Sequence, residues 1–265
     1  MANKTISSRQ NPLVARYRAA ARGEPSDVLL LDGVHLVSEA IAAGTSIRHA
    51  AVKSEAMNIT EIGALVDKLS RSNVEVAVVS ASVMDALSPV RSPSSVVALG
   101  ERPRVAEDAI YRQRALVVIA IDIQDPGNLG AIVRVAEAGG ATGLIAAGAS
   151  ANPFGWKALR GSMGSTLRLP LLVRPDADRA VADARARGCR IVATAPRAGR
   201  SPVDVVLSGP VAILIGGEGL GLPPALVDGA DERVTIPMQR PVESLNAAVT
   251  AALIVYEARR QRSGG

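Results

Sequence analysis

The apolar run Ala115-Leu-Val-Val-Ile-Ala-Ile-Asp122 stands only two residues before the segment Asp125-Pro-Gly-Asn-Leu-Gly-Ala-Ile-Val-Arg134. A short, continuous run of aliphatic residues predicts a strand that is buried on both faces, as in a parallel sheet. Between Leu129 and Ala136, apolar residues recur at positions i, i+3, i+4 and i+7, which predicts a helix with one apolar face. A buried strand that leads into an amphipathic helix indicates an α/β fold.

The same alternation continues in both directions along the chain. Downstream of the first strand, we expect helices at 129–138, 156–160, 177–187 and 245–260, and strands at 142–147, 190–194, 211–215 and 233–236. Upstream, we expect strands at 28–31, 47–53, 74–79 and 95–99, and helices at 34–43, 61–70 and 83–87. Charged residues and a proline interrupt this periodicity at 100–113, which indicates a linker. The sequence therefore predicts a smaller N-terminal α/β sandwich domain over residues 1–105 and a second α/β domain over residues 106–265.

The composition excludes several classes of protein. The chain has 265 residues, 48% of them hydrophobic, with one cysteine and two histidines. These numbers rule out a disulfide framework and a Cys/His zinc site of usual stoichiometry, so no metal is predicted. The N-terminus lacks the apolar core of a signal peptide, and no apolar run is long enough to cross a bilayer. We therefore expect a cytoplasmic protein.

The charge distribution points to a polyanionic partner. The net charge is +5 and the sequence pI is about 9.9. Residues 1–23 contain basic side chains but no acidic one, and Lys or Arg near a phosphate releases condensed counterions. The candidate contacts to such a partner are Arg9, Arg16, Arg18 and Arg22. The alternative is a solvated basic tail.

Two loops in the second half are richer in polar and glycine residues than a simple turn requires. The first is the segment 125–134, in which Gly130 lies four residues before Arg134 and leaves space beside the guanidinium. The plainer interpretation is a turn with Asn128 as helix N-cap and Arg134 as a solvated charge. The second is Ile213-Leu-Ile-Gly-Gly-Glu-Gly-Leu-Gly-Leu-Pro-Pro224. It fails as a Gly-x-Gly-x-x-Gly dinucleotide fingerprint because the third glycine would fall at Leu222. Two interpretations of this segment remain: a plain glycine turn, or a loop whose backbone contacts a flat ligand.

A third segment, Ile236-Pro-Met-Gln-Arg-Pro-Val-Glu-Ser-Leu-Asn246, precedes the last predicted helix. Ser244 is placed to act as the N-cap of that helix. Capping by Ser244 does not explain Asn246, a poor helix former at the start of an apolar run.

Together, and in this order, the three segments resemble the signature motifs of the SpoU (TrmH-like) branch of the SPOUT RNA methyltransferases. The matching residues are Asn128-x-Gly130-x-x-x-Arg134, Gly216-Gly-Glu218-Gly219, and Ile236-Pro-Met238 with Ser244-Leu-Asn246. Arg160-Gly-Ser-Met-Gly-Ser165 with Leu169-Pro170 is similar to the middle segment of the family. The segments Ser7-Ser-Arg-Gln-Asn-Pro12 and Leu31-Asp-Gly-Val-His-Leu-Val-Ser-Glu39 are similar to the ribosomal-protein-like substrate-binding domain of some members.

The resemblance implies an S-adenosylmethionine-dependent RNA ribose 2'-O-methyltransferase that is a homodimer, with a C-terminal α/β domain whose last segment forms a trefoil knot. It implies a cofactor site at Thr194, Ala195, Gly216, Glu218, Gly219, Ile236, Met238, Ser244, Leu245 and Asn246. It implies catalytic roles for Arg134, Asn128, Glu218, Ser244 and Asn246, with Arg134 also contacting RNA. Since an arginine titrates above about pH 12, we expect Arg134 to act as a clamp on phosphate and hydroxyl rather than as a base.

The expected RNA is large-subunit (23S) rRNA, with tRNA as the alternative. Two other functions compete with this assignment. One is a non-catalytic RNA-binding or ribosome-assembly protein with a degenerate methyltransferase domain. The other is a nicotinamide-dependent oxidoreductase that uses the glycine loop, which the broken fingerprint disfavours.

Overall fold

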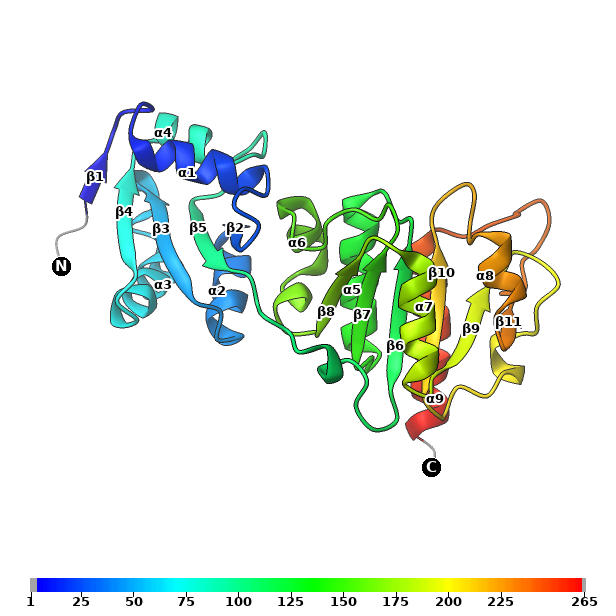
Figure 1. Ribbon diagram of the computed structural model, residues 1–265. Coiled ribbons are helices and arrows are strands. Elements are labelled where there is room, and N and C mark those ends of the chain that lie inside the picture. The colour runs from blue at the N-terminus through cyan, green and yellow to red at the C-terminus, as the bar shows by residue number, and fades with distance from the viewer. Residues whose placement is uncertain (1–3, 264–265) are drawn as a thin grey trace. The chain divides into compact units, whose positions relative to one another are not determined.

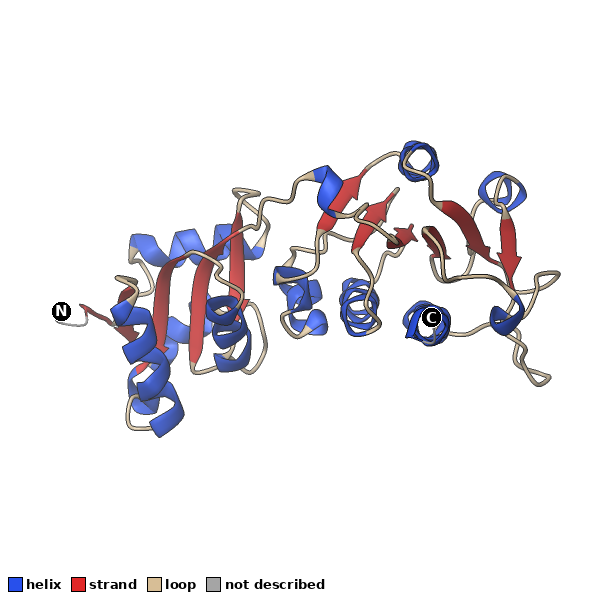
Figure 2. Ribbon diagram, turned by 90° about the horizontal axis from the view of Figure 1, so that it is seen from below, coloured by secondary structure: helices blue, strands red, loops and turns tan. Residues whose placement is uncertain are grey.

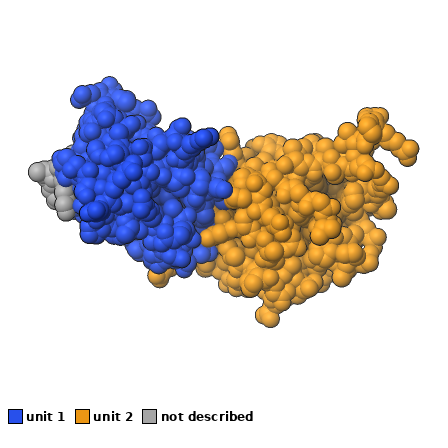
Figure 3. Space-filling model, turned by 90° about the horizontal axis from the view of Figure 1, so that it is seen from above, with its two compact units in different colours: residues 1–103, 154–167 blue, residues 104–153, 168–265 orange. Residues whose placement is uncertain are grey.

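The structure is a computed structural model that describes residues 4–263. It forms two compact units, Met1–Pro103 with Phe154–Leu167 and Arg104–Pro153 with Arg168–Gly265 (Figure 3). Both units are mixed α/β, so the predicted fold class is confirmed. Within the described residues, no helix combines the length and the apolar character that a membrane span requires. The functional division into residues 1–105 and 106–265 stays a prediction.

The first unit is built on a five-stranded sheet in the order β1-β4-β3-β5-β2 (Figure 1). Strands β1, β4 and β3 are parallel, and β5 runs antiparallel to both β3 and β2. The strands are β1 (Lys4–Ile6), β2 (Val28–Asp32), β3 (Ile47–Lys53), β4 (Glu75–Val79) and β5 (Val96–Glu101). The helices are α1 (Pro12–Ala21), α2 (Val34–Ala42), α3 (Thr60–Arg71), α4 (Ala81–Leu87) and α6 (Trp156–Ser162).

The part of the basic N-terminal segment that the structure describes, from residue 4 onward, forms β1 and α1, so the interpretation of this part as a solvated tail is wrong. Residues 12–21 form α1, with Pro12 in its first turn and the Asn11 side chain accepting a hydrogen bond from the Leu13 amide at 2.9 Å. Four residues of α1 are buried: Leu13, Val14, Tyr17 and Ala20. Apolar packing of this helix face holds the segment on the domain.

The second unit is built on a six-stranded, fully parallel sheet in the order β11-β9-β10-β6-β7-β8. The strands are β6 (Leu116–Ile121), β7 (Gly143–Ala147), β8 (Leu171–Arg174), β9 (Arg190–Thr194), β10 (Val211–Gly216) and β11 (Glu232–Val234). The helices are α5 (Pro126–Ala138), α7 (Ala177–Ala186), α8 (Pro224–Asp228) and α9 (Ala247–Ser263). Every residue of β6 is buried, as predicted for a central parallel strand.

Helices cover both faces of the second sheet (Figure 2). Helices α5 and α9 pack against each other on one face. On the other face, Ala180 and Ala184 of α7 join Leu226 of α8 in one core with the side chains of β6 and β10. This two-sided packing explains why the strands are continuous apolar runs. The threading of the last segment into a trefoil knot stays a prediction.

Strand order places a switch point in the middle of the sheet. From β6 the chain runs outward to β7 and β8, and then returns to form β9, β10 and β11 on the other side. In open parallel sheets, ligands bind beyond the carboxyl ends of the strands at such a point. The loops after β6, β9, β10 and β11 all emerge at this edge.

Candidate active site

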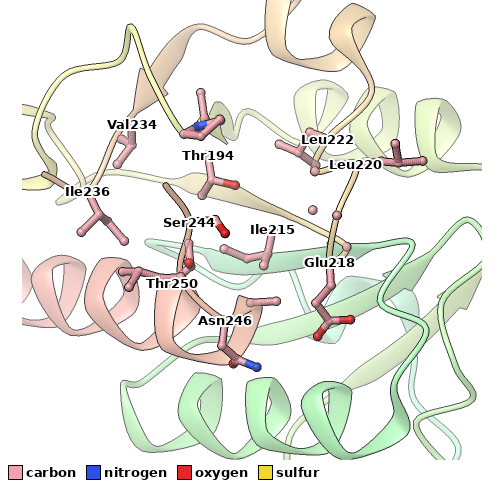
Figure 4. Close-up of a pocket in the computed structure, with 18 of the residues that line it drawn as sticks. Thr194, Ile215, Glu218, Leu220, Leu222, Val234, Ile236, Ser244, Asn246 and Thr250 are labelled. Carbon is pink, nitrogen blue, oxygen red and sulfur yellow. The ribbon is translucent and has the colours of Figure 1, made fainter. Parts of the chain in front are cut away.

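A cavity of about 400 Å³ lies at this edge of the second sheet. Its walls come from the residues that follow β9, β10 and β11 and from the first turns of α9 (Figure 4). Thr194 ends β9, and its hydroxyl donates to the Leu214 carbonyl of β10 at 2.9 Å. The volume is in the range of small-molecule sites, roughly 300–1,000 Å³.

The loop after β10 can form only because it contains glycines. Gly219 and Gly221 have φ of +92° and +69°, a region that side chains disfavour. A Cβ on Gly216 would overlap the backbone of Gly221, and a Cβ on Gly217 would overlap the carbonyl of Asp122. The Gly221 amide donates to the Gly217 carbonyl at 3.1 Å. The loop is therefore a tight backbone turn that opens one side to the cavity.

Thr235 joins two of the cavity walls. Its hydroxyl donates to the Ala195 carbonyl at 3.0 Å and accepts from the Gly199 amide at 2.9 Å. The Thr235 amide donates to the Arg200 carbonyl at 2.9 Å. The chain at 233–235 thus pairs with Arg200 through an isolated parallel bridge. Strand β11 ends at Val234, two residues before the predicted end at Ile236.

Three side chains from distant parts of the sequence form a hydrogen-bonded network beside the cavity. The side-chain amide of Asn128 donates to Glu218 Oε1, and the side-chain amide of Asn246 donates to Asn128 Oδ1 at 3.0 Å. The side chains of Glu218 and Asn246 both extend toward α5 in Figure 4. An asparagine suits the central place because its amide both donates and accepts.

The helix caps correct two expectations from the sequence. The N-cap of α5 is Asp125 and not Asn128. Its Oδ1 accepts a hydrogen bond from the backbone amide of Asn128 at 2.7 Å. The N-cap of α9 is Asn246, whose Oδ1 accepts from the Ala248 amide at 2.8 Å, and not Ser244. Neither the Asn128 side chain nor the Ser244 hydroxyl therefore caps a helix.

The cavity carries a negative charge. Glu218 is the sole ionisable side chain among the residues that line it. A site of this kind suits a cationic group and disfavours a nucleotide diphosphate, which binds at cations or uncapped helix N-termini. The loop after β10 leads into the five-residue helix α8 rather than a long helix. Across residues 4–263, no three His, Cys, Asp or Glu side chains come together as metal ligands.

All ten residues that the sequence suggests for the cofactor line this cavity. Asn128 joins the network although it is not part of the lining. Arg134, six residues further along α5, is exposed and stands outside the lining; at 100° per residue it lies on a different face from Asn128. Other lining residues were not predicted, among them Thr250 and Ile254. Their spacing from Asn246, four and eight residues along one helix face, was the available signal.

The four N-terminal arginines have different surroundings in the first unit. Arg9 Nε donates to the Ser82 carbonyl at 2.7 Å, and Arg18 Nε donates to the Ala86 carbonyl at 3.3 Å, so both fasten α4. Arg22 pairs with Glu24 at 3.4 Å. Arg16 is exposed, and the described residues contain no ion-pair partner for it.

Comparison with known proteins places the chain in a family. Residues 115–256 match the SpoU rRNA Methylase family. The chain is 32% identical, over 97% of its length and 94% of the relative, to an uncharacterized tRNA/rRNA methyltransferase of Synechocystis sp.. It is 28% identical, over 97% and 99% of the two chains, to the 23S rRNA (guanosine(2553)-2'-O)-methyltransferase RlmP of Bacillus subtilis.

Among solved structures, the chain resembles the SpoU methyltransferase AviRb of Streptomyces viridochromogenes in complex with the cofactor AdoMet. The TM-score is 0.86 at 30% identity, over 97% of this chain and 100% of the other. The likeness thus spans both units, while the family match covers the cavity and the three segments that the sequence singled out. The chain belongs to the SpoU rRNA methylase family.

Proposed function

We propose that this protein transfers a methyl group from S-adenosylmethionine to a ribose 2'-hydroxyl of structured RNA, with large-subunit rRNA as the substrate. The observation that carries the proposal is the cavity at the switch point, with the Asn128–Glu218–Asn246 network at its side. Relatives named as 23S rRNA 2'-O-methyltransferases support the reaction and the RNA class.

The residues present fit S-adenosylmethionine. The glycine turn at 216–221 presents backbone groups with no Cβ above them, which allows a flat adenine to approach. Ile215, Ile236 and Leu245 supply apolar walls, and Glu218 provides a charge complementary to a sulfonium. Thr194, Ala195, Gly216, Gly219, Met238, Ser244 and Asn246 complete the proposed cofactor site. No cationic lining residue is available for the diphosphate of a nicotinamide cofactor.

The bound cofactor would supply an activated methyl group, so the protein has mainly to position the acceptor and handle one proton. Asn128, held from both sides by Glu218 and Asn246, is oriented before substrate arrives. We assign the Ser244 hydroxyl, which is exposed, to contact the ribose or the cofactor. We assign the Arg134 guanidinium to clamp the phosphate and polarise the 2'-hydroxyl, because its planar fork of donors suits both oxygens.

We assign RNA selection to residues 1–105 and methyl transfer to residues 106–265. The whole chain contains one Phe, one Trp and three Tyr, too few for extensive base stacking. Recognition therefore depends on phosphate contacts and RNA shape. The proposed contacts are Arg9, Arg16, Arg18 and Arg22. The proposed location of the protein is the cytoplasm.

We also propose that the protein is a homodimer. Helix α9 buries one face, yet Val249, Leu253 and Tyr256 are 47%, 46% and 50% exposed. These residues lie at i, i+4 and i+7, so they form one apolar stripe on the helix. A second copy of this chain is the proposed cover, because a stripe of this kind on a helix that lines the cavity marks an interaction surface.

Incubation of the protein with tritiated S-adenosylmethionine and total RNA tests the reaction. We expect label in large-subunit rRNA, resistant to alkaline cleavage at one ribose. The variant Asn128→Asp is the matched control: it keeps the size of the side chain but places a second carboxylate against Glu218. Label in tRNA would show that the substrate is tRNA and not rRNA. If the wild type bound RNA but transferred no methyl group, the proposed enzymatic activity would be wrong.

A further inference from the structure

Asp122 is the residue at which the chain leaves the central strand β6. Its φ is +57°, a left-handed value that it shares with four other non-glycine residues among those described. Aspartate visits this region more readily than most residues, but glycine does so at no steric cost. An aspartate stands here instead of a glycine, and the contacts of its carboxylate explain why.

That partner is the loop after the neighbouring strand β7. Asp122 Oδ1 accepts a hydrogen bond from the Ala149 amide at 2.7 Å. The carboxylate also occupies the space above Gly148, where any Cβ would overlap it. The Gly148 amide in turn donates to the Arg174 carbonyl at 3.0 Å. The Asp122 side chain therefore ties the end of β6 to the end of β7.

The backbone of the same residue faces the other neighbour, β10. A Cβ on Gly217 would overlap the carbonyl oxygen of Asp122, so the glycine turn rests directly on this peptide. Asp122 thus lies between the β7 loop on one side and the turn that carries Glu218 on the other.

The link extends to the start of α5. The Ile123 amide donates to Ser150 Oγ at 3.0 Å, and the Ala151 amide donates to the Ile123 carbonyl at 2.8 Å. The β7 loop therefore braces residues 122–123, which lead to Asn128. Without the Asp122 carboxylate, the bonds that remain are that of the Asp122 backbone amide to the Ala147 carbonyl at 3.2 Å and those of residue 123.

We propose that Asp122 is a positioning residue: its carboxylate sets the start of α5 against the glycine turn so that Asn128 and Glu218 meet. The proposal rests on the proposed methyl transfer for its kinetic consequence. Its structural consequence does not, because the Asn128–Glu218 contact belongs to the protein alone.

Three substitutions separate the side chain from the backbone. Asp122→Gly keeps the left-handed conformation and removes the carboxylate. Asp122→Ala removes it and adds backbone strain. Asp122→Asn keeps an oxygen that can accept from Ala149. The matched control is Asn73→Gly, which removes the side chain of another left-handed residue (φ +56°) in the first unit.

Amide hydrogen exchange of the ligand-free protein is the first readout. We expect Asp122→Gly and Asp122→Ala to lose protection in peptides covering 123–130, while Asp122→Asn and Asn73→Gly match the wild type. Unchanged exchange in Asp122→Gly would overturn the proposal, whether or not the protein methylates RNA.

Kinetics is the second readout. We expect kcat of Asp122→Gly to fall by about tenfold or more, as for a misplaced catalytic group, while the Kd for S-adenosylmethionine changes by less than about threefold and Asp122→Asn retains most of the turnover. A parallel loss of cofactor binding and turnover would mean that the cavity has collapsed, and this result would also overturn a positioning role. An inactive wild type would instead defeat the proposed function and leave the exchange experiment to decide this one.

Discussion

At the scale of single residues, the candidate site is defined by three side chains that are 90 and 118 residues apart in pairs. Asn128 joins α5 to the glycine turn and to the first residue before α9. Neither Asn128 nor Asn246 is a good helix former. Asn246 is explained by its capping of α9, whereas Asn128 lies inside α5 and is explained by its two bonds. A residue that local structure does not require is here the centre of a network.

The variant Arg134→Ala tests whether the proposed role of Arg134 belongs to methyl transfer and not to cofactor binding. Since Arg134 stands outside the cavity lining, we expect Arg134→Ala to bind S-adenosylmethionine with unchanged Kd. We expect methyl transfer to fall by about 100-fold or more, as for loss of a group that stabilises the transition state. Calorimetry and a filter-binding methylation assay measure the two quantities.

Arg134→Lys is the companion variant, and it keeps the charge without the planar fork. We expect it to recover only part of the rate. Turnover at the wild-type level in Arg134→Ala would remove this residue from the mechanism.

Asp231 makes a pH-dependent contribution to stability. Partial burial alone would raise its pKa, but hydrogen bonds from the Ile191 amide at 2.7 Å and Arg185 at 2.7 Å outweigh that effect and lower the pKa. A carboxyl with a lowered folded-state pKa stabilises the protein above its unfolded pKa, near 4, and this contribution is lost as the pH falls through the folded pKa. Asp231→Asn should therefore lower the Tm at pH 7.

The measurement is the Tm of wild type and Asp231→Asn from pH 7 to pH 3. We expect the two curves to converge as the pH falls below about 4, the unfolded value. A difference in Tm that stays constant over this range would show that the pair has no linked titration.

At the scale of elements, the close approach of α9 to α5 depends on a glycine. A Cβ on Gly139, at the end of α5, would overlap the Val255 side chain of α9. Arg259 of α9 donates to the Ala138 carbonyl at 2.8 Å. Near the end of α9, Arg262 donates to the carbonyls of Ala115 and Leu207 at 3.0 and 2.9 Å. The helix that lines the cavity is thus held along its length by packing and at its end by arginine.

Gly139→Ala tests this packing. We expect a loss of roughly 1–3 kcal/mol in the free energy of unfolding, as for overpacking of a core. Urea unfolding followed by circular dichroism gives the value. Gly209→Ala is the matched control, since a Cβ on Gly209 would meet no neighbouring atom within 4 Å; equal effects of the two substitutions would argue against a steric cause.

At the scale of the whole molecule, charge and assembly are the two properties to be tested. Arg16 is exposed without an ion-pair partner among the described residues, while Arg48 is bonded to Asp27 and Glu101 at 2.9 Å each. If RNA binding releases counterions, the slope of log K against log salt should be negative, and Arg16→Ala should reduce its magnitude by about 0.7–0.9. Arg48→Ala should leave the slope unchanged. Equal slopes for the wild type and Arg16→Ala would exclude a phosphate contact.

The apolar stripe on α9 predicts the effect of a single charge on assembly. We expect Leu253→Glu to convert a dimer into a monomer in sedimentation velocity, because burying an unpaired carboxylate is costly. Ile59→Glu alters a side chain of similar exposure, 50%, in the first unit and should leave the dimer intact. A wild type that sediments as a monomer at micromolar concentration would defeat the dimer outright.

The sequence alone was sufficient for the α/β class and for most strands and helices of both halves. These properties follow local rules. Apolar residues recur with one period in strands and another in helices, and glycines after a strand indicate a tight turn. The ten residues proposed for the cofactor came from the resemblance to the family, and the structure places all ten around one cavity. The packed helix at 12–21 was missed, because the basic residues between its apolar positions suggested a tail. The resemblance to the family then placed three local signals at one site.

Only the tertiary structure decided which polar groups meet. The Asn128–Glu218 bond and the contact of Asp122 with Ala149 join segments whose separation in the sequence carries no signal of proximity. The caps Asp125 and Asn246 are local, but the sequence did not show which of two neighbouring polar side chains caps each helix. The grouping of residues 154–167 with the first unit is of the same kind. The physical reason is that hydrogen bonds and steric fit act over a few ångströms in space, and the parallel sheet brings distant strand ends to one edge.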